Sequence, residues 1–208
     1  MKEIRLALAT RNRGKVREIR EALRELPLQL LTSEDFPEWP VPEEKGSTFE
    51  ENALEKAESL ARFSGMPSLA DDSGLEVEAL GGAPGVSSAH YAGRHGDDAA
   101  NIARLLEEME GITGEGRRAR FVCVLALAGP RGEKLLVREA CEGRIAEEPR
   151  GEGGFGYDPV FVPRGSSLTM AELDLEEKNS LSHRGRALRR LRELLEKGEP
   201  DWLFSSPE

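Results

Sequence analysis

The spacing of apolar residues predicts that strands and helices alternate in the first third of the chain. Short continuous apolar runs are typical of strands, whereas apolar residues at every third or fourth position are typical of amphipathic helices. Glycine and proline mark the segments between them. In order, the pattern predicts a strand at 4–9, a helix at 16–26 ended by Pro27, a strand at 29–32, a loop at 35–46 and a helix opened by a capping box at 47–50.

The rest of the chain adds a hairpin to this alternation. Residues 120–128 and 134–142 predict two strands joined by a Gly-Pro-Arg-Gly turn. The other predicted elements are a strand at 68–70, an alternating stretch at 75–77, a loop at 80–85, a helix at 97–109, a glycine-dense segment at 151–158, a strand at 159–162, a brief helix opened by a capping box at 169–172 and a last helix capped by Ser182. We therefore expect a mixed α/β fold in which two lobes share one sheet.

Charge and composition narrow the class of protein. The 208 residues include 29 Lys and Arg against 39 Asp and Glu, a formal net charge of −10. This balance argues against a surface that coats nucleic acid, and no apolar run approaches the ~20 residues that span a membrane. The apolar stretch before Arg11 is too short for a signal peptide, and Cys123 and Cys141 lie in strand-like runs typical of buried thiols in a reducing compartment. We expect a soluble cytoplasmic protein.

The polar turn from Thr10 to Lys15 is the first candidate site. It lies between a predicted strand and a predicted helix, where backbone N–H groups and the helix dipole favour an anion. Thr10 and Asn12 add hydrogen-bonding side chains, Gly14 allows close approach, and Lys15 adds a positive charge. The segment does not match a Walker P-loop. The alternative is an ordinary strand–helix turn with a capping asparagine.

The adjacent carboxylates Asp71 and Asp72 form the second candidate site. Two carboxylates directly after an apolar strand are costly to bury unless they are solvated, capped or bound to a metal. Hard oxygen ligands suit Mg²⁺, which takes one or two protein carboxylates and leaves its other positions to water and phosphate. Glu43 and Glu44, in the proline-rich loop, could join such a site. The alternative is ordinary turn chemistry, because Asp-Ser-Gly is common in turns and helix caps.

Two further segments contain recognition chemistry. In the glycine-dense segment, Phe155 or Tyr157 could stack on a base while Asp158 accepts a hydrogen bond from its N–H edge. Near predicted helix ends, three residues suit phosphate or base-carbonyl recognition: Lys178, His183 and Arg184. The alternatives are a loop with Phe155 as a core residue and the cationic start of a surface helix.

Together these segments resemble one family in their order and spacing. The chain is similar to the Ham1-like inosine triphosphate pyrophosphatases, also called non-standard purine NTP pyrophosphatases. The matching segments span nearly the whole chain: ATRNRGKVREI at 9–19, EEKGSTFEENALEKA at 43–57, LADDSGLEVEALGGAPGVSSAHYAG at 69–93, GGFGYDPVFVP at 153–163 and AELDLEEKNSLSHRGRAL at 171–188.

The resemblance implies an activity, a cofactor and a fold. The implied reaction is hydrolysis of ITP, dITP and XTP to the monophosphate and pyrophosphate, which clears damaged purines from the nucleotide pool. The implied cofactor is Mg²⁺, with Mn²⁺ as a second option, and the implied assembly is a homodimer. The implied fold is a single Ham1-like domain over residues 1–208, an elongated mixed sheet flanked by helices, with the nucleotide in a cleft between two lobes.

Matched motif by motif, the resemblance also implies roles for individual residues. Asp72 would be the catalytic carboxylate and, with Glu43, a metal ligand, although Glu44 is the neighbouring choice. The residues implied to bind substrate are Thr10, Arg11, Asn12, Arg13, Gly14, Lys15, Ser73, Phe155, Gly156, Tyr157, Asp158, Lys178, His183 and Arg184. The chain departs from the family at Arg11, where glycine is usual, and at His90, where arginine is usual.

These roles predict a reaction and leave two rival functions open. We expect water to attack the α-phosphorus, with Asp72 or Asp71 orienting or deprotonating it. A donor facing the purine 6-oxo group, from a backbone N–H, His183 or Arg184, would exclude adenine, whose 6-amino group is itself a donor. The rivals are a nucleotide-binding module without turnover and a Maf-type pyrophosphatase for pyrimidine triphosphates. The paired aspartates argue against the first rival, and the FGYDP and SHRG segments argue against the second.

Overall fold

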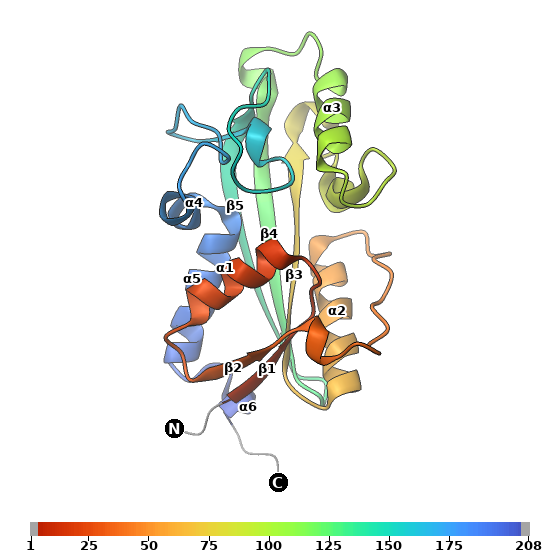
Figure 1. Ribbon diagram of the computed structural model, residues 1–208, viewed down its shortest axis with the longest axis vertical. Helices are drawn as coiled ribbons and strands as arrows, with labels where there is room; N and C mark the ends of the chain where they lie inside the picture. Colours follow the sequence, from red (N-terminus) through yellow and green to blue (C-terminus); the bar gives the residue numbers. More distant parts are fainter. Residues whose placement is uncertain (1–3, 205–208) are drawn as a thin grey trace. The chain divides into compact units, whose positions relative to one another are not determined.

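A six-stranded mixed sheet forms the centre of the fold (Figure 1). The computed structural model describes residues 4–204. The strands are β1 (Ile4–Leu8), β2 (Leu28–Leu31), β3 (Ser68–Val77), β4 (Arg118–Ala128), β5 (Lys134–Ile145) and β6 (Phe161–Pro163), and they lie in the order β2-β1-β3-β4-β5-β6. β1 pairs in parallel with β2 and β3, whereas β5 and β6 are antiparallel. The predicted α/β fold with a mixed sheet flanked by helices is confirmed.

The helices connect and flank these strands. They are α1 (Arg13–Leu23), α2 (Phe49–Ser64), α3 (Asp98–Glu108), α4 (Leu175–Leu181), α5 (His183–Glu196) and α6 (Asp201–Phe204). α2 packs against β1, as apolar residues on one helix face require. Between residues 4 and 204, no helix combines the length and the apolar character needed to cross a membrane.

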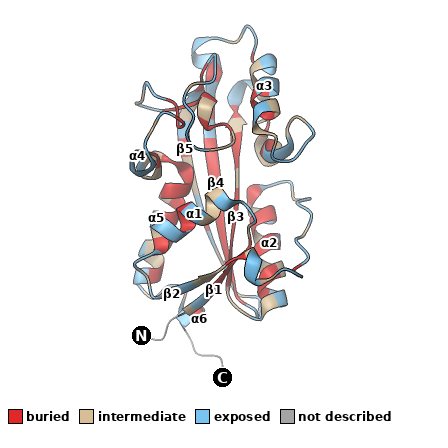
Figure 2. Cartoon of the chain, viewed as in Figure 1, coloured by how far each residue is buried: buried red, intermediate tan, exposed pale blue. Residues whose placement is uncertain are grey.

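The chain divides into two compact units, each with its own buried core. The first unit contains residues up to 72, residues 124–138 and residues from 187 onward, and the second contains 73–123 and 139–186. Large buried side chains of the first unit include Leu6, Leu8, Ile19, Leu23 and Leu60. The core of the second unit includes Leu75, Ile102, Leu105, Met109, Phe121, Ile145, Tyr157 and Phe161. Figure 2 shows the resulting concentration of buried residues along β3 and β4.

The structure excludes ordinary turn chemistry at 71–74, the alternative that the sequence left open for the paired aspartates. β3 continues through Asp71 and Asp72 to Val77 without a break. The Asp-Ser-Gly sequence favours a turn only when no sheet neighbour competes for its backbone, and here the tertiary context keeps it extended. The adjacent aspartates are therefore strand residues.

The two predicted capping boxes are also corrected. α2 is capped by Thr48, whose hydroxyl accepts from Glu51 N at 3.2 Å, so the cap lies one residue later than expected. At the second box, the Glu172 carboxylate accepts from Thr169 N at 2.7 Å, but the backbone makes only a turn there. The nearby helix α4 begins instead after Asp174, where a capping box with the residue three positions later is complete.

Smaller differences concern where elements end. α1 ends at Leu23, three residues earlier than predicted, and β5 extends three residues further, to Ile145. β6 begins at Phe161, because the residues before it form a 3₁₀ turn. The cap of the last helix is confirmed, since the Ser182 hydroxyl accepts from Gly185 N at 3.0 Å. Cys123 and Cys141 are buried free thiols, as predicted.

Candidate active site

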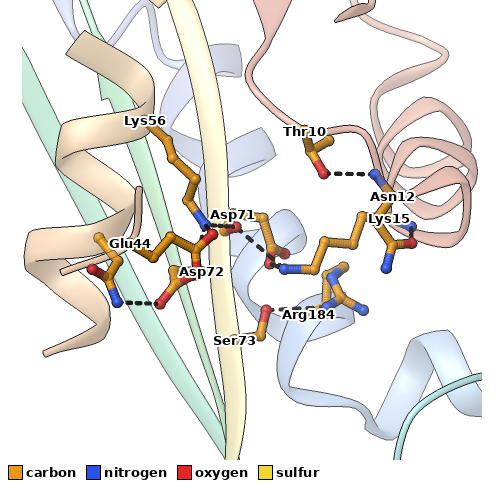
Figure 3. A network of polar contacts seen from close by, with 10 residues as sticks. Thr10, Asn12, Lys15, Glu44, Lys56, Asp71, Asp72, Ser73 and Arg184 are labelled. Carbon is orange, nitrogen blue, oxygen red and sulfur yellow. Dashed lines mark hydrogen bonds and ion pairs between the residues drawn. The ribbon is translucent and has the colours of Figure 1, made fainter. Parts of the chain in front are cut away.

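Asp71 and Asp72 point to opposite faces of β3, because successive side chains of a strand alternate. Asp71 Oδ1 lies 2.5 Å from Lys15 Nζ, on α1. Asp72 Oδ1 lies 2.6 Å from Lys56 Nζ, on α2. Figure 3 shows the two lysines approaching the strand from either side. Each aspartate therefore has its own helix and its own ammonium partner.

Lys56 is the centre of a group that we call the carboxylate cluster, formed by the buried Lys56 and Asp72 and the exposed Glu44 (Figure 3). Its Nζ donates to Glu44 Oε1 at 2.9 Å, to Asp72 Oδ1 at 2.6 Å and to the Asp71 carbonyl at 3.1 Å. Burial alone would lower the pKa of Lys56, but the charges of Asp72 and Glu44 outweigh it and raise the pKa. The two carboxylates therefore favour the charged form of Lys56.

Burial dominates the ionisation of Asp72. Its side chain is 7% exposed, and this burial raises its pKa above the ordinary value. Lys56 and Lys15 offset part of the increase, while the negative charge of Glu44 adds to it. A carboxylate whose pKa lies closer to the working pH is a stronger general base than an exposed one. The position suits Asp72 for accepting a proton.

Asn52 holds the loop that carries the glutamates. Its amide oxygen accepts from Gly46 N at 2.8 Å, and its amide nitrogen donates to Asp72 Oδ2 at 3.5 Å. A Cβ on Gly46 would lie only 2.6 Å from Asn52 Oδ1, so the loop can come this close only with glycine there. In this arrangement Glu44 reaches Lys56, whereas the 79% exposed side chain of Glu43 pairs with Lys45.

The chemistry of the carboxylate cluster fits a divalent cation. Glu44 and Asp72 direct hard oxygen donors toward the same ammonium group, so both carboxylates already lie around one positive charge. Across the part of the chain that the structure describes, no group of three or more His, Cys, Asp and Glu side chains could hold a metal ion. A cation held here would therefore complete its shell with ligand oxygens and water, which is usual for Mg²⁺.

The turn before α1 is fixed by its own side chains. Thr10 Oγ1 accepts from Asn12 N at 3.2 Å, and Asn12 Oδ1 accepts from Lys15 N at 3.1 Å, which caps the helix. The turn adjoins a cavity of about 480 Å³ whose charged lining residues are four arginines and two glutamates: Arg11, Arg13, Arg17, Arg20, Glu21 and Glu34. A preformed helix N-terminus beside four guanidinium groups can bind a polyanion.

In the second unit, the segment from 153 to 158, here called the base loop, folds around one carboxylate. Asp158 Oδ2 accepts from Phe155 N at 2.9 Å and from Lys178 Nζ at 2.8 Å. Gly154 has a φ of +76°, and a Cβ there would lie 2.1 Å from Asp158 Oδ2. The close approach of the loop to this carboxylate therefore requires glycine at position 154.

Cations surround the aromatic ring of the base loop. Lys178 Nζ lies 4.8 Å and the Arg184 guanidinium 5.3 Å from the centre of the Phe155 ring. Arg184 also donates to Ser73 Oγ at 3.0 Å. His183 stacks on Phe121 with ring centres 4.6 Å apart. The half-exposed Phe155 is thus a platform fixed by charged neighbours, not a core residue.

Tyr157 differs from Phe155, because it is buried and its hydroxyl donates to the Ser88 carbonyl at 3.0 Å. It anchors the base loop from inside the core. The residues predicted as site residues thus form two groups, one in each unit. The first unit contains the contacts among Thr10, Asn12, Lys15, Asp71 and Asp72. The second unit contains the contacts among Ser73, Phe155, Asp158, Lys178 and Arg184.

Sequence reasoning missed Asn52 and Lys56. Both are buried, and they lie four residues apart, on the same face of α2 as its apolar stripe. An amide and an ammonium group inside a buried helix stripe are costly unless they have partners. This interruption of the stripe was the available signal. Asp98, which bonds the base loop at Gly156 N, was also missed.

Comparisons with known proteins agree with these observations. The Ham1 family matches residues 6–194. The dITP/XTP pyrophosphatase of Geobacter sulfurreducens is 53% identical over 191 residues, which cover 92% of this chain and 96% of that protein. The dITP/XTP pyrophosphatase of Bacillus anthracis is 49% identical over 206 residues, which cover 98% of this chain and 99% of that protein.

Solved structures give the same result. A Ham1 protein from Coxiella burnetii superimposes with a TM-score of 0.86 at 44% identity, and the match covers 93% of this chain and 99% of that chain. The Ham1 protein of Staphylococcus aureus superimposes with a TM-score of 0.84 at 41% identity, and the match covers 94% of this chain and 100% of that chain. The family predicted from the motifs is confirmed, and this chain belongs to the Ham1 family.

Proposed function

We propose that this protein hydrolyses dITP, ITP and XTP to the nucleoside monophosphate and pyrophosphate. The observation that carries the proposal is the carboxylate cluster, in which Glu44 and Asp72 share the Lys56 ammonium at 2.9 and 2.6 Å. The relatives named as dITP/XTP pyrophosphatases support the choice of substrate. By this activity the enzyme removes non-standard purines from the nucleotide pool.

The turn before α1 binds the triphosphate in this proposal. The turn combines helix N–H groups with cationic side chains. Its residues are Thr10, Arg11, Asn12, Arg13, Gly14 and Lys15. Because Thr10 and Asn12 already bond the backbone of the turn, their main task is to hold its shape. Direct charge on the phosphates comes from the arginines and Lys15. Arg11, in place of the usual glycine, adds a cation and donates to the Trp39 carbonyl at 3.4 Å.

Glu44 and Asp72 are the residues that would hold a divalent metal ion, Mg²⁺ or Mn²⁺. We prefer Glu44 to the originally expected Glu43, because Glu44 belongs to the carboxylate cluster and Glu43 pairs with Lys45. When bound, the ion supplies charge compensation for the phosphate oxygens and the leaving group. Lys56 fixes both carboxylates in position and offers its own charge to a phosphate oxygen.

Asp72 orients and deprotonates the attacking water. The water oxygen forms a bond to the α-phosphorus, the bond from that phosphorus to the bridging oxygen breaks, and pyrophosphate leaves with the electron pair. The proton passes to Asp72, whose pKa is raised by burial, which suits a general base. Asp71 keeps Lys15 in place through the 2.5 Å ion pair and is a positioning residue.

The second unit supplies base recognition. Phe155 stacks on the purine. Beside it, the base loop continues through Gly156, Tyr157 and Asp158. The polar contacts to the nucleotide are completed by Lys178 and Ser73. The N–H groups of Phe155 and Gly156 already donate to carboxylates. The donor to the purine 6-oxo group is therefore Arg184 or His183. An unpaired donor facing the adenine 6-amino group costs about 1–3 kcal/mol, which favours ITP over ATP.

The active form in this proposal is a homodimer in the cytoplasm. Nucleotide pools and reduced thiols occur there, which suits a nucleotide hydrolase with two buried free cysteines. Light scattering on the purified chain measures the mass in solution, and a value close to 22.9 kDa would contradict the dimer.

A nucleotide panel tests the activity. We expect pyrophosphate release from ITP, dITP and XTP with Mg²⁺ or Mn²⁺, at least tenfold slower release from ATP, and none with EDTA. Equal kcat/KM on ITP and ATP would contradict recognition of the 6-oxo group. Faster hydrolysis of pyrimidine triphosphates would favour the Maf-type rival, and tight binding without pyrophosphate release would favour the non-catalytic module.

A further inference from the structure

The base loop is attached to α3 by one hydrogen bond that none of the roles above explains. Gly156 N donates to Asp98 Oδ2 at 2.7 Å, between residues 58 positions apart in the chain. A hydrogen bond from a backbone N–H to an ionised carboxylate is stronger than one between neutral groups. Asp98 therefore holds the peptide group that joins Phe155 to Gly156.

We propose that Asp98 is a positioning residue that sets the orientation of the base loop and thereby the preference for 6-oxopurines. This inference rests on the proposed function, because it assigns base recognition to Phe155 and its neighbours. Asp98 does not touch the base in this proposal. It acts through the backbone of Gly156.

Helix α3, which carries Asp98, is firmly held in the second unit. Asn101, one turn further along the helix, is buried; its side chain accepts from Ala92 N at 2.7 Å and donates to the Ala89 carbonyl at 3.3 Å. Ile102 and Leu105 of the same helix lie in the core of the second unit. Functional groups held by packed, hydrogen-bonded elements keep their geometry better than groups held by loops.

The base loop, in contrast, has no regular secondary structure and is held by individual hydrogen bonds. Gly156 has a φ of +61°, and glycine populates many other backbone conformations at similar energy. Tyr157 is anchored through its hydroxyl to the Ser88 carbonyl, and Phe155 N is anchored by Asp158. Only the bond to Asp98 holds the Gly156 N–H, among the hydrogen bonds formed by residues 4–204. Removing it frees the peptide group next to the Phe155 platform.

The neighbouring Asp97 provides a matched control. It is the N-cap of α3, and its Oδ1 accepts from Ala100 N at 3.1 Å. The two aspartates are adjacent and of equal charge, but Asp97 bonds its own helix whereas Asp98 bonds the base loop. A substitution of Asp97 therefore removes an equal charge from the same helix end but keeps the acceptor of the Gly156 N–H.

Steady-state kinetics on four proteins test the proposal: wild type, Asp98→Ala, Asp98→Asn and Asp97→Ala. For Asp98→Ala we expect the KM for ITP to rise about tenfold with kcat within about threefold, and the kcat/KM preference for ITP over ATP to fall about tenfold. Asp98→Asn keeps an acceptor oxygen and should stay within about threefold of wild type. Asp97→Ala should keep the wild-type preference. An unchanged preference in Asp98→Ala, or an equal loss in Asp97→Ala, overturns the proposal.

Hydrogen exchange separates this inference from the proposed function, because it needs no turnover. Peptides covering residues 153–158 should exchange about tenfold faster in Asp98→Ala than in wild type, and at the wild-type rate in Asp97→Ala. Equal exchange in all proteins overturns the role of Asp98 even if the enzyme is active. Suppose that only Asp98→Ala exchanges faster and that the wild type releases no pyrophosphate. This pair of results would support the attachment of the base loop by Asp98 and contradict the proposed function.

Discussion

The carboxylate cluster and the base loop use different physics to hold their functional groups. In the cluster, Glu44, Lys56 and Asp72 bond one another through charged side chains on or beside regular elements. In the base loop, carboxylates bond backbone N–H groups and so fix the path of a glycine-rich segment. Changes of charge should therefore damage the cluster most, whereas changes of backbone geometry should damage the loop. We therefore expect substitutions to separate chemistry from selectivity in this protein.

The largest expected effect comes from neutralising Asp72, the proposed base. Asp72→Asn should lower kcat by about 10³-fold, because an amide cannot accept the proton and is a poor metal ligand. The change is nearly isosteric, so the fold should persist, which circular dichroism can check. Pyrophosphate release under saturating ITP measures the loss. Activity within tenfold of wild type would remove Asp72 from the chemistry.

Lys56→Met should have the next largest effect, about 10²-fold on kcat/KM. It leaves Glu44 and Asp72 without their shared cation, and loss of the buried Lys56–Asp72 pair should destabilise the fold by about 3–5 kcal/mol. The pKa of Asp72 is raised by burial and partly held down by Lys56, so losing Lys56 raises it further. The base must be ionised, so the acid limb of the pH profile of kcat/KM should move to higher pH. A limb that moves to lower pH would contradict this coupling.

The two adjacent glutamates provide a matched pair for the metal. Glu44→Gln should raise the Mg²⁺ concentration for half-maximal activity about tenfold, whereas Glu43→Gln should leave it unchanged. The physical reason is that only Glu44 belongs to the carboxylate cluster. Titration of activity with Mg²⁺ at saturating ITP distinguishes them. The reverse ranking would restore Glu43 as the ligand.

The smallest effect on turnover should come from the second unit. Arg184→Met should reduce the kcat/KM preference for ITP over ATP about fivefold to tenfold, with kcat on ITP changed less than threefold, because it removes one donor. The comparison between the two regions predicts that this variant keeps the wild-type Mg²⁺ requirement. A large loss of kcat without a change of preference would place Arg184 with the phosphates.

The motifs allowed the family and the mixed sheet to be predicted and supplied the candidate site residues, because each motif is local in sequence. Alternatives stayed open where a partner distant in sequence decides the outcome. Asp-Ser-Gly suits a turn locally, but pairing within the sheet keeps β3 extended. Two neighbouring glutamates are equivalent in sequence, and only Lys56, on another element, distinguishes them.

Residues that act as partners were the hardest to predict. Asn52 and Lys56 looked like ordinary positions of a helix, and Asp98 looked like ordinary helix-start chemistry. Their importance depends on contacts to Asp72 and Gly156, 16 to 58 residues away. A polar residue inside an apolar helix stripe is the one signal that sequence reasoning could have used for α2.

The alternation of side chains along β3 has a consequence for the evolution of this protein. Asp71 faces α1 and Asp72 faces α2. The face on which each aspartate lies therefore depends on the number of residues before it in the strand. Deleting or inserting a single residue within 68–70 would exchange their faces while keeping both carboxylates in the sequence. We therefore expect variation in the length of this segment to be less tolerated than substitution of its apolar residues, and alignments that place a gap there to mark proteins with a different chemistry.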